Sequence, residues 1–137
     1  MTEAFCRAQG PLAQIDAGVH GFLYIFVFWN QSRSALTFEQ ILQELKQGTY
    51  RPVYFLHGKE PYFIDAISDF IEDKVLSEVE RAFNQTVVYG KEVDHLAMLD
   101  AARRYPMGAA HQVLILKEAQ EMRSLKELQS YIEQPLD

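Results

Sequence analysis

The stretch that decides the fold is residues 53–75, VYFLHGKEPYFIDAISDFIEDKV. It opens with a run of β-forming residues that is apolar on both faces, as a strand covered on both sides requires. A short loop containing Gly58 follows, and Pro61 suits the first turn of a helix. Apolar residues then recur at spacings of three and four as far as Val75. The stretch therefore predicts a buried strand, a tight loop and a helix that packs on the strand.

From residue 37 onward, helix and strand patterns alternate. Thr37 and Gln40 form a capping-box pattern before a first helix, and Ser124 and Glu127 form the same pattern before a last helix. The expected elements between them, besides residues 53–75, are a strand over 83–89 (FNQTVVY), a helix over 94–104 and a strand over 112–116 (QVLIL). This alternation predicts an α/β fold with a small parallel sheet, right-handed crossovers and flanking helices.

The loop after the first predicted strand lies where a phosphate-binding loop would lie, because backbone N–H groups at a helix N-terminus bind anions. Starting the pattern G-x-x-x-x-G-K-[ST] at Gly58 places Phe63 at the second glycine, Ile64 at the lysine and Asp65 at the hydroxyl. Lys59 is interpreted as a solvated charge. We therefore expect a degenerate, non-functional phosphate loop and no nucleotide cofactor.

Other catalytic patterns are missing from the sequence as well. Lys117 ends the third predicted strand, where an NTPase would place an acid for magnesium. The four histidines show no metal-ligand spacing, Cys6 is the single cysteine, and there is no G-x-S-x-G motif. We expect no metal site and no intrinsic catalysis.

Composition indicates one globular domain, since the chain has 137 residues with 48% hydrophobic and 23% charged residues. The net charge is −6, and residues 1–36 contribute none of it. Such a balance argues against a strong phosphate-binding surface. The apolar run over residues 21–29 is too short to span a membrane, so we expect no membrane partner. A single cysteine allows no intramolecular disulfide, so we expect a cytoplasmic protein.

Residues 103–108 (RRYPMG) join the second predicted helix to the third strand. On chemistry alone, Pro106 terminates the helix and Met107 is partly buried. In the alternative interpretation, the apolar residues Pro106 and Met107 are exposed and contact a binding partner.

Three segments resemble the bacterial DNA polymerase III delta subunit: residues 53–71, 83–90 (FNQTVVYG) and 105–120 (YPMGAAHQVLILKEAQ). The resemblance covers roughly residues 37–133 and is strongest to Bacteroidetes-type delta sequences. It implies an AAA+-like, P-loop-type domain that has lost its nucleotide site.

The resemblance also implies a role in DNA replication. The N-terminal domain of delta binds and opens the sliding clamp, and the other clamp-loader subunits bind ATP. An apolar pair before the third strand enters a pocket of the clamp, and it corresponds here to Pro106 and Met107. Relatives often carry a second bulky residue where this chain has Gly108, so Met107 is the expected anchor. Contacts with the other subunits and, indirectly, with DNA within the polymerase holoenzyme would need domains that the sequence lacks.

We expect residues 37–137 to form a partial delta N-terminal domain and residues 1–36 to be an atypical extension. The extension is either a misplaced start, with Leu36 as the true initiator, or a genuine strand over residues 22–29 added to the sheet. For the whole chain, the alternative is a generic α/β protein-interaction domain without clamp affinity.

Overall fold

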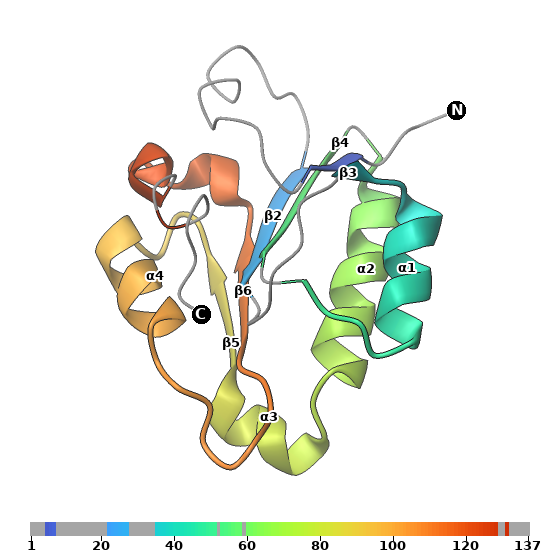
Figure 1. The fold of residues 1–137 in the computed structure, drawn as a ribbon. Helices are drawn as coiled ribbons and strands as arrows, with labels where there is room; N and C mark the ends of the chain where they lie inside the picture. Colours follow the sequence, from blue (N-terminus) through green and yellow to red (C-terminus); the bar gives the residue numbers. More distant parts are fainter. Residues whose placement is uncertain are drawn as a thin grey trace.

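A central β-sheet lies between two layers of helices (Figure 1). This computed structural model describes residues 5–7, 22–27, 35–51, 53–58, 60–128 and 131. The strands are β1 (Phe5–Arg7), β2 (Phe22–Val27), β3 (Ala35–Leu36), β4 (Val53–Gly58), β5 (Gln85–Tyr89) and β6 (Val113–Lys117). The helices are α1 (Phe38–Lys46), α2 (Pro61–Lys74), α3 (Glu78–Asn84), α4 (His95–Ala102) and the 3-10 turns η2 (Ala119–Glu121) and η3 (Leu125–Leu128).

Strand order in the described sheet is β3-β1-β4-β2-β6-β5. β5 and β6 pair in parallel, as the α/β pattern predicted. β4 and β6 are both antiparallel to β2, so β4 also runs parallel to β5 and β6 without pairing with either. The prediction of an α/β fold with a small parallel sheet and flanking helices is thus confirmed, but the complete sheet is mixed.

The sequence left undecided whether residues 22–29 form a strand of this sheet, and the structure places β2 between β4 and β6. Along β2 the register runs from Phe22 opposite Gly58 to Val27 opposite Val53, and Phe26 faces Ile115 of β6 on its other side. The described part of the strand predicted over residues 22–29 therefore belongs to the sheet and is central in it, and residues 28 and 29 lie outside the described residues.

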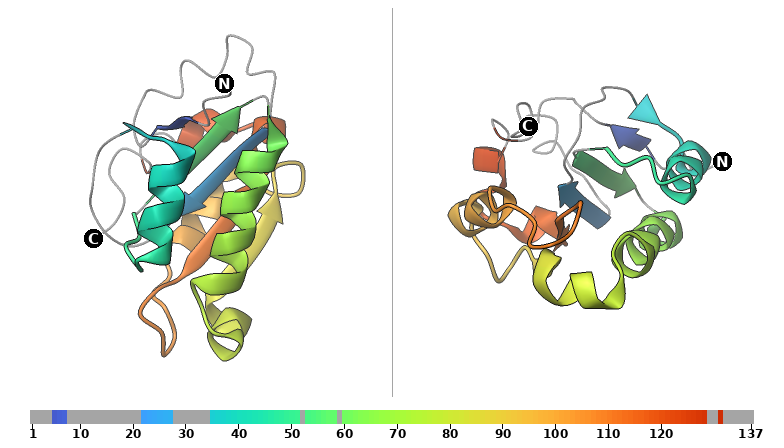
Figure 2. Two further views of the ribbon diagram at one scale, coloured as in Figure 1. Left: turned by 90° about the vertical axis from the view of Figure 1, so that its right-hand side faces the viewer. Right: turned by 60° about the horizontal axis from the view of Figure 1, so that its bottom comes forward.

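Side chains alternate between two cores, one on each face of the sheet. Val113 and Ile115 of β6 pack with the buried faces of α1 and α2, whereas Leu114 and Leu116 pack with Met98 of α4 and with the 3-10 turns. These four apolar side chains of β6 are each at most 1% exposed. The continuous apolar runs predicted strands covered on both faces, and Figure 2 shows α1 and α2 side by side over one of those faces.

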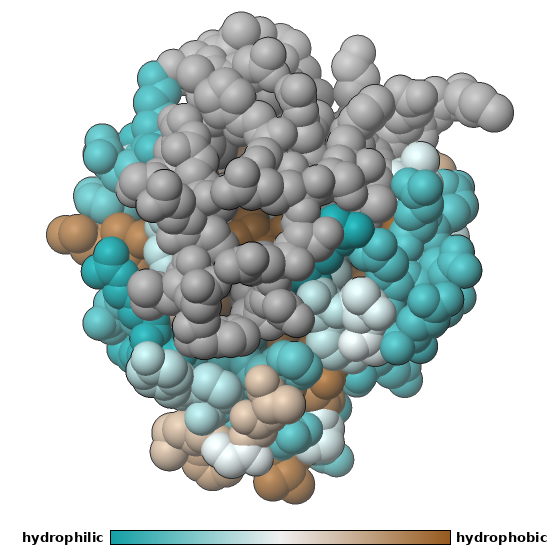
Figure 3. All heavy atoms as spheres, viewed as in Figure 1, coloured by the Kyte–Doolittle hydropathy of each residue, from teal (hydrophilic) through white to brown (hydrophobic). Residues whose placement is uncertain are grey.

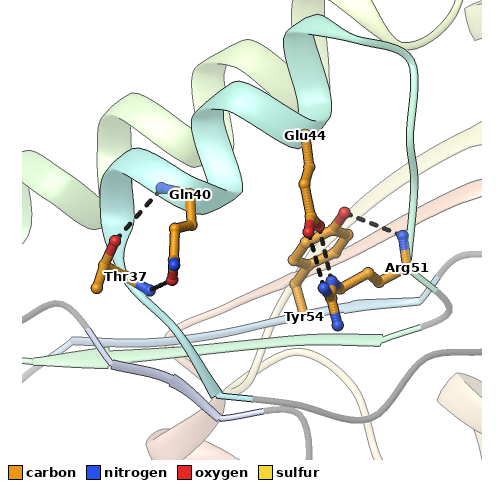
Figure 4. Close-up of polar contacts among 5 residues, drawn as sticks. All are labelled: Thr37, Gln40, Glu44, Arg51 and Tyr54. Carbon is orange, nitrogen blue, oxygen red and sulfur yellow. Dashed lines mark hydrogen bonds and ion pairs between the residues drawn. The ribbon is translucent and has the colours of Figure 1, made fainter.

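Polar contacts fix both the start of α1 and its connection to β4 (Figure 4). Thr37 and Gln40 exchange the two hydrogen bonds of the predicted capping box. Beyond the helix, the Arg51 guanidinium donates to both carboxylate oxygens of Glu44, at 2.7 and 2.8 Å, and its backbone N–H donates to the buried Tyr54 hydroxyl. The hydrogen bond from Arg51 lowers the pKa of Glu44, and the Arg51 charge acts in the same direction against the opposing effect of burial.

Several predicted boundaries differ from the structure: the helix over 94–104 is observed as α4, which ends at Ala102, and the strand over 112–116 is observed as β6, Val113–Lys117. The second strand begins at Gln85 and not at Phe83, because residues 78–84 form α3. Where the last helix was predicted, the Ser124 Oγ accepts from the backbone N–H of His95, and Leu125–Leu128 form a 3-10 turn. The Ser124 side chain therefore links the segment before η3 to the start of α4. Beyond Leu128, most of that predicted helix lies outside the described residues.

Candidate functional site

The first turn of α2 occupies the place of a phosphate-binding loop, but the side chains at the second-glycine and lysine positions pack against the protein. Pro61 is the first residue of α2, after β4 ends at Gly58. Ile64, at the lysine position of the pattern, is 1% exposed and belongs to the core beside α1. Phe63 stacks edge-on against Phe38 with ring centroids 5.0 Å apart.

This turn therefore offers no cation at the lysine position, and the bulky Phe63 ring stands where a glycine would admit a phosphate. Asp65 is exposed, and Lys59 lies outside the described residues.

The end of β6 holds an ion pair where an NTPase would place an acid. Lys117 Nζ lies 3.0 Å from Oε2 of Glu72 on α2, and both side chains are partly buried. Burial lowers the pKa of Lys117, but the hydrogen bond and the charge of Glu72 outweigh it, and the net shift is upward. The lysine thus stays charged and binds a helix of its own domain.

At the opposite end of the sheet, the loop between α4 and β6 presents an apolar side chain to solvent. Met107 is 69% exposed and Pro106 is half-buried. Gly108 follows with φ +66°, a left-handed conformation that favours glycine. The simplest chemical interpretation, a partly buried Met107, is therefore wrong, because most of this side chain is exposed to solvent.

Asn84, the last residue of α3, fixes the backbone of this loop. Its Oδ1 accepts from the Met107 N–H at 2.6 Å, and its Nδ2 donates to the Met107 carbonyl at 3.1 Å. Nδ2 also donates to the Glu80 carbonyl one turn earlier. The residue is 3% exposed. A buried amide thus makes a two-way, peptide-like contact with the backbone of Met107, whose side chain is largely exposed.

The helix α3 adds two more exposed apolar side chains. Val79 and Phe83 lie four residues apart, on one face of the helix, and are 74% and 69% exposed. Figure 3 shows apolar atoms gathered at the end of the molecule formed by α3 and the loop before β6. We call Val79, Phe83, Tyr105 and Met107 the apolar end. Exposed apolar clusters mark contact surfaces more often than isolated exposed residues do.

Sequence reasoning found Met107 but missed the contribution of α3. The signal was present: Ser77 and Glu80 form a capping box in the structure, with both reciprocal hydrogen bonds. These bonds lower the pKa of the exposed Glu80. Asn84 could not be recognised, because its partner lies 23 residues further along the chain.

Comparison with known protein families matches residues 54–137 to one family, described as DNA polymerase III, delta subunit. This chain belongs to the delta-subunit family. Neither the search of curated proteins nor the search of solved structures gave a match. The matched range of the delta-family chain begins inside β4 and includes α2, α3, the apolar end and β6.

The electrostatics of the apolar end in this delta-family chain are mixed. Arg104 pairs with Asp100 one turn earlier on α4 at 2.7 Å, and both side chains are largely exposed. Arg81 of α3 contacts Asp73 at 3.3 Å. Arg104 and Arg81 thus each have an acidic partner, which partly offsets their positive charge.

Within the part of the chain that the structure describes, no group of three or more His, Cys, Asp or Glu side chains is arranged to hold a metal ion. None of the helices in that part of the chain has the length and apolar content that crossing a membrane requires.

Proposed function

We propose that this delta-family chain binds the sliding clamp of DNA replication through Met107 and Pro106, as a component of the clamp loader. The observation that carries the proposal is the exposure of Met107 on a loop whose backbone is hydrogen-bonded to a buried side chain. Interface hot spots are anchors that fill a desolvated pocket of the partner, and an anchor on an ordered backbone loses less conformational entropy on binding.

The proposal assigns the domain a binding role without nucleotide chemistry. An AAA+-like ancestry would account for a strand, loop and helix in the P-loop arrangement, and the buried Ile64 explains why ATP would not bind. Binding energy at the apolar end would instead favour an open clamp conformation. Other clamp-loader subunits in the cytoplasm would bind ATP, and DNA would be contacted indirectly through the full complex. In this account residues 37–137 are the delta domain and residues 1–36 an extension of it.

Calorimetric titration of the chain with its cognate sliding clamp tests the proposal. Burying a methionine side chain contributes about 1.5–3 kcal/mol, so Met107→Ala should weaken binding about tenfold to a hundredfold. Met107→Asp should abolish detectable binding, because a carboxylate in an apolar pocket loses its hydration.

Tyr62→Asp is the matched control, because Tyr62 is 70% exposed and lies at the end of α2 remote from α3. It should bind like the unaltered chain. A folded chain without clamp affinity would refute the proposal and leave a generic α/β interaction domain.

A further inference from the structure

We infer that Asn84 is a positioning residue that holds Met107 in its docking conformation before the partner arrives. The inference rests on the proposed function and deepens it, because it names a residue that acts on the partner only through Met107. Asn84 itself is 3% exposed, so a partner cannot contact it directly without rearrangement.

The hydrogen-bonding groups explain why an amide suits this position. The Met107 N–H needs an acceptor and the Met107 carbonyl needs a donor, and Asn84 supplies both from one planar group. The second amide hydrogen goes to the Glu80 carbonyl. Turning the amide over would set donor against donor and acceptor against acceptor, so these partners fix its orientation.

Packing of the Met107 side chain does little to fix the conformation of the loop. This side chain is mostly in solvent, and Gly108 beside it has the most conformational freedom of any residue type. Without Asn84 the loop would populate several conformations, and binding would have to select or order one of them. Only the competent fraction binds, so the apparent affinity falls in proportion to that fraction.

A double-mutant cycle with the sliding clamp tests this role. We expect Asn84→Ala to weaken clamp binding about tenfold. In a chain that already carries Met107→Ala, the same substitution should change the affinity by less than about twofold, because the side chain that Asn84 positions is gone.

Hydrogen exchange on the unaltered chain provides a second measurement that needs no variant. The Met107 amide should exchange at least tenfold more slowly than the Gly108 amide, because it donates to a buried acceptor. Equal exchange at the two amides would overturn the inference even if Asn84→Ala fails to fold.

The outcomes separate the two claims. If Met107→Ala weakens binding but Asn84→Ala does not, the positioning role is refuted and the proposed function stands. If Asn84→Ala weakens binding equally with and without Met107, it acts through general stability and the inference fails. If Met107→Ala leaves affinity unchanged, the docking role is refuted and the positioning role falls with it.

Discussion

Replacing Ile64 by lysine would restore the cation of the phosphate-loop pattern at its sequence position. In this fold the substitution should destabilise the chain without creating a nucleotide site. Ile64 is 1% exposed, and its neighbours in the core include Ile67 and Leu45. An ammonium group there would lack both water and a phosphate to pair with.

The cost at pH 7 is bounded, because a buried lysine loses its proton instead of remaining charged. Deprotonating a group with an ordinary pKa of about 10.4 at pH 7 spans about 3.4 pKa units, or roughly 4.6 kcal/mol at about 1.36 kcal/mol per unit. Losing the isoleucine costs up to about 1.5–3 kcal/mol, part of which the lysine methylenes recover. We therefore expect the free energy of unfolding to fall by about 5 kcal/mol.

Urea unfolding followed by circular dichroism at pH 7, 8 and 9 measures this effect. The folded pKa of the new lysine lies below its unfolded pKa, so the unfolded state binds more protons between the two values. The stability of Ile64→Lys relative to the unaltered chain should thus rise with pH, by up to about 1.4 kcal/mol per unit. Tyr62→Lys, exposed in the same helical turn, should cost under about 1 kcal/mol. A stable Ile64→Lys chain that binds ATP would refute the reasoning.

Two further predictions concern stability. Glu44→Gln should lower the free energy of unfolding by about 2 kcal/mol at neutral pH, because it breaks a partly buried bidentate pair with Arg51. The folded pKa of Glu44 lies below its ordinary value of 4.5, so this contribution should be complete above that pH and fade as the pH falls through the folded pKa. Urea titrations in which Glu44→Gln and the unaltered chain lose stability identically in acid would contradict this. Gly90→Ala should cost about 2–3 kcal/mol, since its Cβ would overlap the Glu118 carbonyl oxygen and lie 3.0 Å from the Met122 nitrogen. Thermal unfolding with an unchanged melting temperature would show that the backbone can shift.

Local signals account for what the sequence predicted correctly. The capping pair Thr37 and Gln40, Pro61 at the start of α2 and Asp94 at the N-terminus of α4 each act within one helical turn, and all three are found in place. The burial of β4 and β6 on both faces also followed from their continuous apolar runs.

Contacts between distant segments account for what it missed. Aromatic and β-forming residues follow one another over residues 83–89 and predict a strand, but the helix that begins at the Ser77 capping box extends through Asn84. The place of β2 between β4 and β6 depends on pairing across about 30 and 90 residues, which no local pattern specifies. The same holds for the contact of Asn84 with Met107.

Hydrogen–deuterium exchange of the chain with and without the sliding clamp tests the central claim most directly, because it locates the contact as well as detecting it. The account predicts that the clamp slows exchange in the loop around Met107 and in the adjacent α3, and leaves the first turn of α2 at Tyr62 unchanged. Protection confined to other elements, or no protection at clamp concentrations that saturate the complex, would contradict it.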